Sequence, residues 1–273
     1  MKPAKARTPE ATVRAIYRKL SRTWGRQHWW PAETPFEVIA GAILTQNTSW
    51  TNVERALSSL KAEGKLSIEG IRELPLPELE KLVRSSGYFR RKAQRLKNFV
   101  CFLDVRYAGS LEQMYAAPTQ ELRAELLSLN GIGPETADSI LLYGGSHETF
   151  VVDAYTRRVL ERHESISVAA KYDAIRGLVE RALRRELASP PATARTPDPG
   201  RPPIHSPSAM STAPRSPMAQ IYNEMHGLLV QVGKHYCVKQ EPKCNLCPLG
   251  PLLPSPRPHP DIVGRKTKNQ RGR

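Results

Sequence analysis

Two carboxylates at the expected starts of helices are the first candidates for chemistry in this 273-residue chain. Asp153 follows an apolar run at 150–152 and precedes a helical pattern at 154–163, so it occupies an N-cap position. Glu135 lies in the first turn of another expected helix, where the helix dipole favours a negative charge. A fixed carboxylate can stabilise positive charge that develops on a reacting group and can orient a water molecule. The residues alone leave capping and catalysis equally open for Asp153.

A glycine hairpin precedes both carboxylates in the sequence. Gly131 and Gly133 flank Ile132, and Pro134 then takes a first helical position, where its missing N–H costs nothing. Apolar stripes lie on both sides of the turn, formed by Leu122, Leu126 and Leu129 before it and by Ala137, Ile140 and Leu141 after it. Glycines let the backbone approach a ligand closely, and free N–H groups at a helix start favour an anion. The sequence therefore predicts a helix–hairpin–helix unit that contacts phosphate. DNA is the natural source, because such contacts position a protein without reading sequence.

The composition narrows the class of partner. The chain carries 41 Lys and Arg against 26 Asp and Glu, a formal net charge of +15. This charge favours nucleic acid ahead of a membrane surface, although a merely basic protein has the same composition. No stretch resembles a transmembrane span, and the N-terminal MKPAKARTPE lacks the apolar core of a secretory signal. Three of the four cysteines cluster near the C-terminus instead of forming a secreted disulfide framework, so we expect a reducing, cytoplasmic setting.

Helical periodicity runs through most of the chain. Apolar residues recur at helical spacing in the segments 11–24, 36–44, 49–60, 77–86, 90–105, 119–129 and 219–232. Thr34 and Glu37 are expected to form a capping box, and Gln46 and Asn47 fall in the polar turn that follows 36–44. No segment shows a convincing strand alternation. We therefore predict an all-α fold.

Two segments break the helical pattern. The segment 189–217 holds nine of the 24 prolines and almost no large apolar residues, so it cannot bury enough surface to offset its ordering entropy. The tail 254–273 is proline-rich and then basic. We expect 189–217 to be a disordered insert between two helices of one domain, and the tail to be a disordered arm with weak affinity for DNA.

The hairpin and Asp153 together resemble the helix-hairpin-helix DNA glycosylases of base excision repair, the endonuclease III superfamily. The signature of these enzymes is an L-x-G-[IV]-G-x-x-[ST]-A hairpin followed by a V-D element with the catalytic aspartate. The hairpin is matched by Leu129, Gly131, Ile132, Gly133, Thr136 and Ala137. Asp153 falls at the spacing of the family, and the resemblance spans 11–188 and 219–253.

The resemblance implies two helical lobes. A six-helix barrel over 36–142 would end in the helix-hairpin-helix. The segments 11–35 and 145–253 would form a second helical lobe that carries the catalytic aspartate and a cysteine loop. The groove between the lobes would hold the active site, with Asp153 at its edge.

By the same resemblance, the protein is a nucleoid-associated monomer that binds double-stranded DNA and hydrolyses the N-glycosidic bond of a flipped-out damaged base. Asp153 would stabilise the oxocarbenium-like transition state. Gln46 matches the wedge glutamine that fills the vacated space in the duplex, with Asn47 beside it; an ordinary polar helix end is the alternative. Further DNA contacts are expected from Gly131, Gly133 and Thr136.

Glu135 occupies the position at which family members that also nick DNA carry a lysine. That lysine forms a Schiff base with the sugar, and a carboxylate cannot form an imine. The resemblance therefore predicts a monofunctional glycosylase without efficient lyase activity, with Glu135 in the catalytic site. Asp138, one turn later, is expected to face solvent rather than the pocket floor.

Aromatic residues near the expected pocket bear on the substrate, because stacked indoles suit an electron-poor or cationic base such as a ring-alkylated purine. The pocket is predicted from Trp29, Trp30, Pro31 and Trp50, with core packing as the alternative role for the tryptophans. The stretches WWP, PFE, LTQNT, GYFRRKAQRLK, GIGPETADSILLY and VVDAY are similar to the bacterial 3-methyladenine glycosylase branch. Leu228 departs from a lysine that this branch can carry after the His-Gly pair.

The cysteines near the C-terminus resemble part of a metal site. Cys237-x6-Cys244-x2-Cys247 matches the first three ligands of the endonuclease III iron–sulfur loop, but Leu253 stands at the fourth ligand position. A [4Fe–4S] cluster normally takes four thiolates. His235 or His259 could supply a fourth ligand to iron or zinc, and a metal-free remnant is the other expectation. Catalysis would require no cofactor in either case.

Three other functions stay open. An endonuclease III-type glycosylase and lyase acting on oxidised pyrimidines would need a reactive lysine where Glu135 stands. A mismatch glycosylase would remove adenine or thymine. A non-catalytic DNA-binding module would use the hairpin for phosphates alone and would not need the Asp153 carboxylate.

Overall fold

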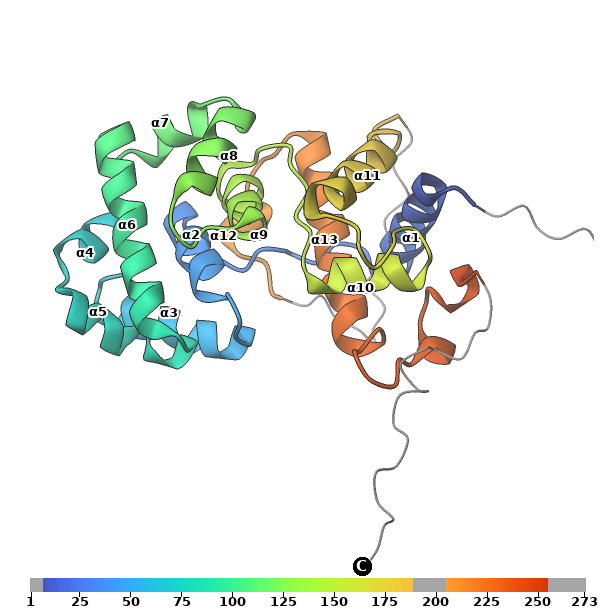
Figure 1. Cartoon of the computed structure of the whole chain (residues 1–273), viewed down its shortest axis with the longest axis horizontal. Coiled ribbons are helices and arrows are strands. Elements are labelled where there is room, and N and C mark those ends of the chain that lie inside the picture. The colour runs from blue at the N-terminus through green and yellow to red at the C-terminus, as the bar shows by residue number, and fades with distance from the viewer. Residues whose placement is uncertain (1–6, 189–204, 255–273) are drawn as a thin grey trace, which may run out of the picture.

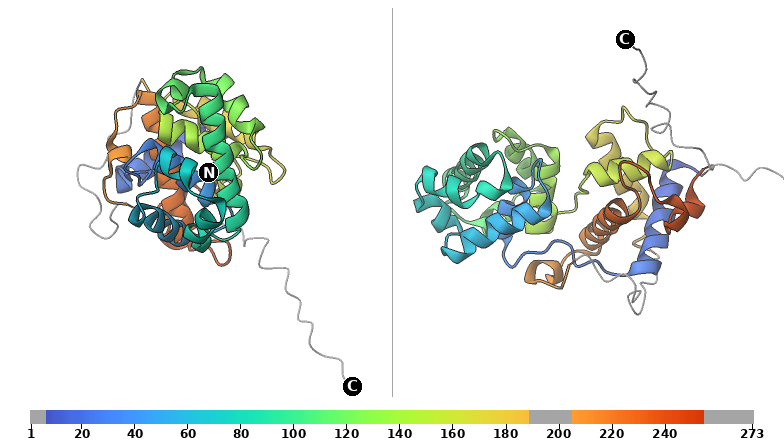
Figure 2. Two further views of the ribbon diagram at one scale, coloured as in Figure 1. Left: turned by 90° about the vertical axis from the view of Figure 1, so that its left-hand side faces the viewer. Right: turned by 90° about the horizontal axis from the view of Figure 1, so that it is seen from below.

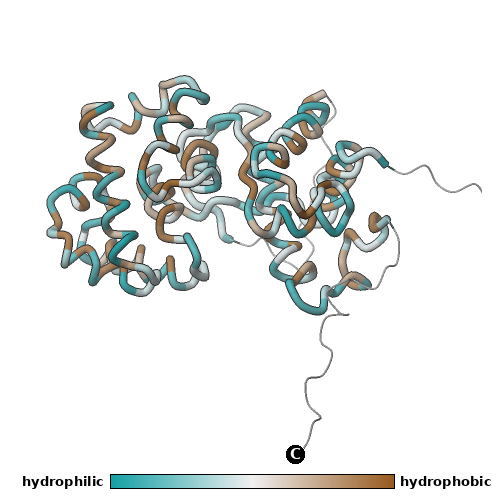
Figure 3. The backbone as a smooth tube through the Cα atoms, in the orientation of Figure 1, coloured by the Kyte–Doolittle hydropathy of each residue, from teal (hydrophilic) through white to brown (hydrophobic). Residues whose placement is uncertain are grey.

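The computed structural model describes residues 7–188 and 205–254, and every regular element within them is helical. The all-α prediction is confirmed, and the helices gather in two lobes that lie side by side (Figure 1 and Figure 2). Two separate clusters of buried apolar side chains form the cores of these lobes. Hydrophobic and hydrophilic stretches alternate along the chain, as expected of amphipathic helices that each turn one face inward (Figure 3).

The first lobe contains eight α-helices, namely the six expected from the sequence and two further short ones. They are α2 (Pro35–Leu44), α3 (Trp50–Ala62), α4 (Ile68–Glu73), α5 (Leu76–Leu82), α6 (Phe89–Tyr107), α7 (Leu111–Ala116), α8 (Thr119–Ser128) and α9 (Pro134–Ser139). The additional helices α4 and α7 have six residues each, too few to display an apolar repeat. Their N-caps, Ser67 and Ser110, accept hydrogen bonds from backbone N–H groups three residues on and stabilise these short turns.

Helix α2 begins at a variant of the expected capping box. The Thr34 hydroxyl accepts a hydrogen bond from the Glu37 N–H (3.1 Å), as predicted. The Glu37 carboxylate, however, accepts from the N–H of Glu33 (3.0 Å), one residue before the cap. Lys61 of α3 pairs with the same carboxylate (2.6 Å) and ties α3 to the start of α2.

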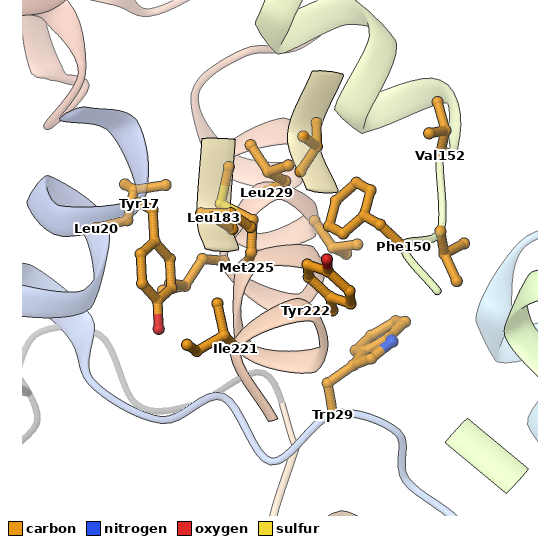
Figure 4. Packing of buried hydrophobic residues seen from close by; sticks show 14 of the residues in the cluster. Tyr17, Leu20, Trp29, Phe150, Val152, Leu183, Ile221, Tyr222, Met225 and Leu229 are labelled. Carbon is orange, nitrogen blue, oxygen red and sulfur yellow. The ribbon is translucent and has the colours of Figure 1, made fainter. Parts of the chain in front are cut away.

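The second lobe surrounds α13 (Pro217–His235) with α1 (Pro9–Trp24), α10 (Ala154–Arg162) and α11 (Tyr172–Arg184). Apolar side chains from several of these helices meet in its core, among them Leu20, Leu183, Met225 and Leu229 (Figure 4). Helix α13 is buried over most of its surface because the other helices and the run at 150–152 cover it. This lobe thus joins segments from both sides of the first lobe in the sequence.

The expected disordered insert is shorter than its composition suggests. Residues 189–204 lie outside the described residues, but 205–217 include α12 (Ala209–Thr212), so the prediction of disorder is wrong for this part. The Ser208 hydroxyl accepts a hydrogen bond from the Ala32 N–H (3.2 Å), and the Met210 N–H donates to the Ala32 carbonyl (3.0 Å). Met210 is buried in the core of the second lobe. These contacts with a distant segment supply a stabilisation that local composition does not reveal.

The described chain ends in two short turns, η3 (Cys244–Leu246) and η4 (Gly250–Leu252), the second of which contacts α1. The predicted arm 254–273 lies outside the described residues except for its first residue. None of the helices in the described ranges is long and apolar enough to cross a membrane.

Candidate active site

A cavity of about 880 Å³ opens between the two lobes. The first lobe contributes the α2–α3 loop and the hairpin, and the second contributes the start of α10 and part of α13. The predicted site residues that line it are Trp29, Trp30, Gln46, Asn47, Trp50, Gly131, Gly133, Glu135, Thr136 and Asp153. Pro31 does not line it, which corrects the predicted pocket. The next residue, Ala32, is hydrogen-bonded to the α12 segment and draws the chain toward that segment.

Asp153 is the N-cap of α10, as predicted, and still faces the cavity. Its Oδ1 accepts a hydrogen bond from the Thr156 N–H (2.6 Å), and its Oδ2 lies 3.5 Å from Nε2 of His226. The side chain is 11% exposed. Burial alone would raise the pKa of this carboxyl, but His226 and the hydrogen bond from Thr156 outweigh it and hold the pKa of Asp153 below its ordinary value. The carboxylate is therefore ionised at neutral pH and fixed in position.

His226 and Tyr143 support Asp153 from behind, and the sequence analysis assigned a role to neither. The Tyr143 hydroxyl lies 2.6 Å from Nδ1 of His226, whose Nε2 faces Asp153. Tyr143 belongs to η2 (Ile140–Gly144), the wider turn that continues α9, and both rings are buried. The available signal was a histidine on an otherwise apolar stretch of α13, because a buried imidazole needs hydrogen-bond partners.

Glu135 faces the same cavity from the first turn of α9. Among the described residues, no hydrogen bond or ion pair engages its carboxyl group, which stays accessible to solvent through the cavity. Desolvation by the surrounding walls and repulsion from Asp153 raise the pKa of Glu135 to about 7, against an opposing effect of His226. The site therefore holds two carboxyls whose pKa values are pushed apart, a pattern typical of paired acid and base roles.

Asp138 faces neither solvent nor the cavity, which corrects the sequence expectation. It is fully buried and accepts hydrogen bonds from Arg123 of α8, at 2.7 Å to Oδ1 and 3.2 Å to Oδ2. The Thr149 hydroxyl also donates to Oδ1 (3.2 Å), and Arg123 reaches Asp173 of α11 (2.9 Å). Asp138 belongs to α9, Thr149 to the segment that leads to α10, and Asp173 to α11 in the second lobe. The network therefore holds α9 against the segment that leads to α10.

Gln46 is bound to the hairpin instead of projecting freely. Its Nε2 donates to the Gly131 carbonyl (2.9 Å) and to the Thr136 hydroxyl (2.8 Å), and its Oε1 accepts from Arg95 of α6. A Cβ atom on Gly131, whose φ of +85° already favours glycine, would overlap the Arg95 side chain. The exposed member of the predicted wedge pair is Asn47, which has a φ of +55°.

The tryptophans serve both of the roles considered for them. Trp29 and Trp30 are 8% and 4% exposed and belong to the core of the second lobe, yet both reach the cavity wall. Trp30 stacks on Tyr143 with 5.1 Å between ring centroids and stands edge-on to Trp50 at 5.0 Å. The indoles thus meet at steep angles instead of lying parallel, and they form an aromatic wall beside the carboxylates.

An exposed aromatic side chain, Tyr88, follows a turn that is tied to the end of α2, and the sequence analysis assigned it no role. Tyr88, at the start of α6, has a φ of +46° and is 66% exposed. The buried Lys92 ammonium donates to the carbonyls of Leu44 (2.8 Å) and Ser86 (2.6 Å), so it joins the end of α2 to the turn η1 (Arg84–Ser86) before Tyr88. An exposed tyrosine with arginines nearby in the chain is typical of nucleic-acid contacts.

The clustered cysteines line a second, small cavity of about 20 Å³. Cys237, Cys244 and Cys247 share it with Leu253, whose side chain offers no ligand at the fourth position. His235 does not line this cavity, and His259 lies outside the described residues. Within 7–188 and 205–254, no group of three or more His, Cys, Asp or Glu side chains is placed to hold a metal ion. The donor set therefore does not fit a four-thiolate cluster.

Known proteins share this architecture. The model of a family described as HhH-GPD superfamily base excision DNA repair protein matches residues 40–185. The chain is 42% identical over 236 residues to MJ1434 of Methanocaldococcus jannaschii, provisionally named a DNA repair glycosylase; the match covers 86% of this chain and 92% of that protein.

Two solved structures give similar superpositions. The 3-methyladenine DNA glycosylase MagIII of H. pylori, bound to 1,N6-ethenoadenine, has a TM-score of 0.65 and 27% identity, and the match covers 84% of this chain and 98% of that one. A trapped endonuclease III–DNA covalent intermediate has a TM-score of 0.66 and 20% identity, with 90% and 95% covered. The second likeness shows the fold alone.

Proposed function

The chain belongs to the HhH-GPD superfamily of base-excision-repair DNA glycosylases, and we propose that it is a monofunctional member that releases alkylated purines such as 3-methyladenine from duplex DNA. The observation that carries this proposal is the pair of carboxyls in one cavity, an ionised Asp153 and a Glu135 at the position of the lyase lysine. The likeness to a solved 3-methyladenine glycosylase and the aromatic wall support the choice of base.

Asp153 acts on the sugar. As the bond between C1′ and the base breaks, the sugar acquires oxocarbenium character, which the ionised carboxylate stabilises. Water then adds to C1′, and the products are a free base and an abasic site. His226 is a positioning residue in this scheme, since it holds Oδ2 while the Thr156 N–H holds Oδ1. A carboxylate fixed in advance needs no reorganisation in the transition state.

The surface around the cavity supplies contacts for a flipped nucleotide. The backbone at Gly133 has no side-chain cap on the N–H groups that follow it, so these donors are available to a phosphate. We assign the space left in the duplex to Asn47 and Tyr88, which are exposed and follow two segments, the end of α2 and the turn η1, that Lys92 joins. Gln46 then acts from behind, by bracing the hairpin through Gly131 and Thr136.

One observation favours the lyase alternative. Lys234 of α13 lines the cavity, and desolvation lowers the pKa of its amine, so a larger fraction of the amine is neutral and able to attack. An imine between this amine and C1′ would allow strand nicking even with a carboxylate at position 135. The nucleophile of the lyase alternative would therefore be Lys234, and this assignment can be tested directly.

Borohydride trapping on abasic duplex DNA separates the two functions. We expect no covalent adduct with the wild-type protein, because the cavity residue beside Asp153 is a carboxylate. The Glu135→Lys variant should form an adduct, since it places an amine at the position where the related lyases carry one. Trapping of the wild-type protein that is lost in Lys234→Ala would establish the lyase alternative instead.

A further inference from the structure

We propose that Glu135 donates a proton to the departing base, so that the enzyme also releases purine lesions that carry no positive charge. This inference rests on the proposed glycosylase function and extends its substrate class. A purine alkylated at N3 or N7 is already cationic and leaves as a neutral molecule. A neutral purine lesion would leave as an anion unless an acid protonates it, so its release depends on a proton donor in the site.

The placement of Glu135 suits this role. Its carboxyl group lies in the same cavity as Asp153, and among the described residues it has no hydrogen-bond or ion-pair partner that would have to be displaced. Pro134 and the first turn of α9 restrict its backbone, and the Ser139 hydroxyl donates to its carbonyl (2.7 Å). The backbone of Glu135 is therefore held in place at the wall of the cavity, while its carboxyl group is available to a bound base.

Desolvation in the cavity and the surrounding charges together set the protonation state of Glu135. The groups that act on it or share the cavity come from several elements: Asp153 before α10, His226 and Lys234 on α13, Tyr143 in η2, Tyr172 on α11 and Arg95 on α6. Desolvation and the Asp153 charge raise the pKa of Glu135 to about 7. The acid form therefore predominates below about pH 7, and the proton is lost as the pH rises above that value. Asp153 stays ionised across this range because its pKa is lowered.

The proton and electron balance closes within the site. The electron pair of the C1′–N bond moves to the purine, and the Glu135 carboxyl proton moves to a ring nitrogen, so the base leaves as a neutral molecule. Water adds its oxygen to C1′, and the proton that it releases restores the carboxyl group of Glu135. The net reaction is hydrolysis, with Asp153 unchanged.

Parallel excision from two kinds of duplex tests this role. One duplex is alkylated and carries 3-methyladenine as the cationic lesion, and the other carries 1,N6-ethenoadenine as the neutral lesion. Single-turnover rates of base release are measured from pH 5.5 to pH 9 for the wild-type protein, for Glu135→Gln and for Glu112→Gln. Glu112 is the matched control because it also stands exposed in the first turn of a six-residue helix and does not line the cavity.

We expect Glu135→Gln to lower the ratio of neutral to cationic release by about 100-fold or more, since general acid catalysis contributes at least that much. In the wild-type protein this ratio should fall as the pH rises above about 7. Glu112→Gln should leave both the ratio and its pH dependence unaltered.

Other outcomes overturn the inference in distinguishable ways. If Glu135→Gln lowers the rate of base release equally for both lesions, the residue does not act as a proton donor. Release of the cationic lesion alone by the wild-type protein would leave the proposed function standing and remove this inference. Release of neither lesion would overturn both.

Discussion

Replacing Asp153 by asparagine should lower the rate of base release by at least about 100-fold, because the developing sugar cation loses the negative charge that stabilises it. Asparagine is as good an N-cap as aspartate, so α10 and the fold should be retained. The measurement is single-turnover release of 3-methyladenine, together with the dissociation constant for alkylated duplex DNA. Binding should change little, since the carboxylate is 11% exposed and faces the base pocket rather than the phosphates.

A second substitution separates capping from catalysis at the same position. Asp153→Ala removes both the charge and the cap, so it should lower the free energy of unfolding by about 1 kcal/mol in addition to the loss of turnover. The asparagine variant should show the loss of turnover alone. Undiminished turnover in Asp153→Asn would remove the residue from the mechanism and leave it only its capping role.

Arg123→Met should be the most destabilising substitution near the site. It would leave the Asp138 carboxylate, which has no exposed surface, without its bidentate partner, and losing one member of a buried ion pair costs about 3–5 kcal/mol. The free energy of unfolding is measured by urea denaturation. The rate of base release by Arg123→Met should also fall, even under conditions in which the variant is folded. The reason is that the network holds α9 against the segment before α10.

The chain offers a matched control for this experiment. Arg72 also forms a bidentate pair, with Asp104, but at the surface, where water screens it. Arg72→Met should therefore change the stability much less than Arg123→Met. A double variant, Arg123→Met with Asp138→Leu, should recover part of the lost stability because no buried charge is left unpaired. Equal effects of Arg72→Met and Arg123→Met would mean that the buried network contributes no more than a surface pair.

Local sequence signals sufficed for part of the site. The hairpin depends on neighbouring glycines and a proline, and the cap at Asp153 depends on the residues that directly follow it, so both could be predicted. Short helices such as α4 could not be predicted, because six residues are too few to show an apolar helical repeat. The order of residues 205–217 could not be predicted either, because their stabilising partner, Ala32, is distant in the sequence.

Contacts between distant segments account for the rest. Tyr143 and His226 are 83 positions apart, and nothing local to either residue indicates that they meet behind Asp153. Asp138 looks solvent-facing in the sequence because its partner Arg123 lies on another helix. Gln46 looks like a free wedge for the same reason, since its hydrogen bonds reach a hairpin 85 to 90 positions away.

Release of 3-methyladenine from alkylated duplex DNA, with strand nicking scored in the same reaction, tests the proposed function most directly. We expect free base to accumulate while the strands stay intact until alkali is added, because Asp153 supports hydrolysis and Glu135 offers no amine for an imine. No release from alkylated DNA, combined with nicking of duplexes that carry oxidised pyrimidines, would contradict both the assigned substrate and the monofunctional chemistry.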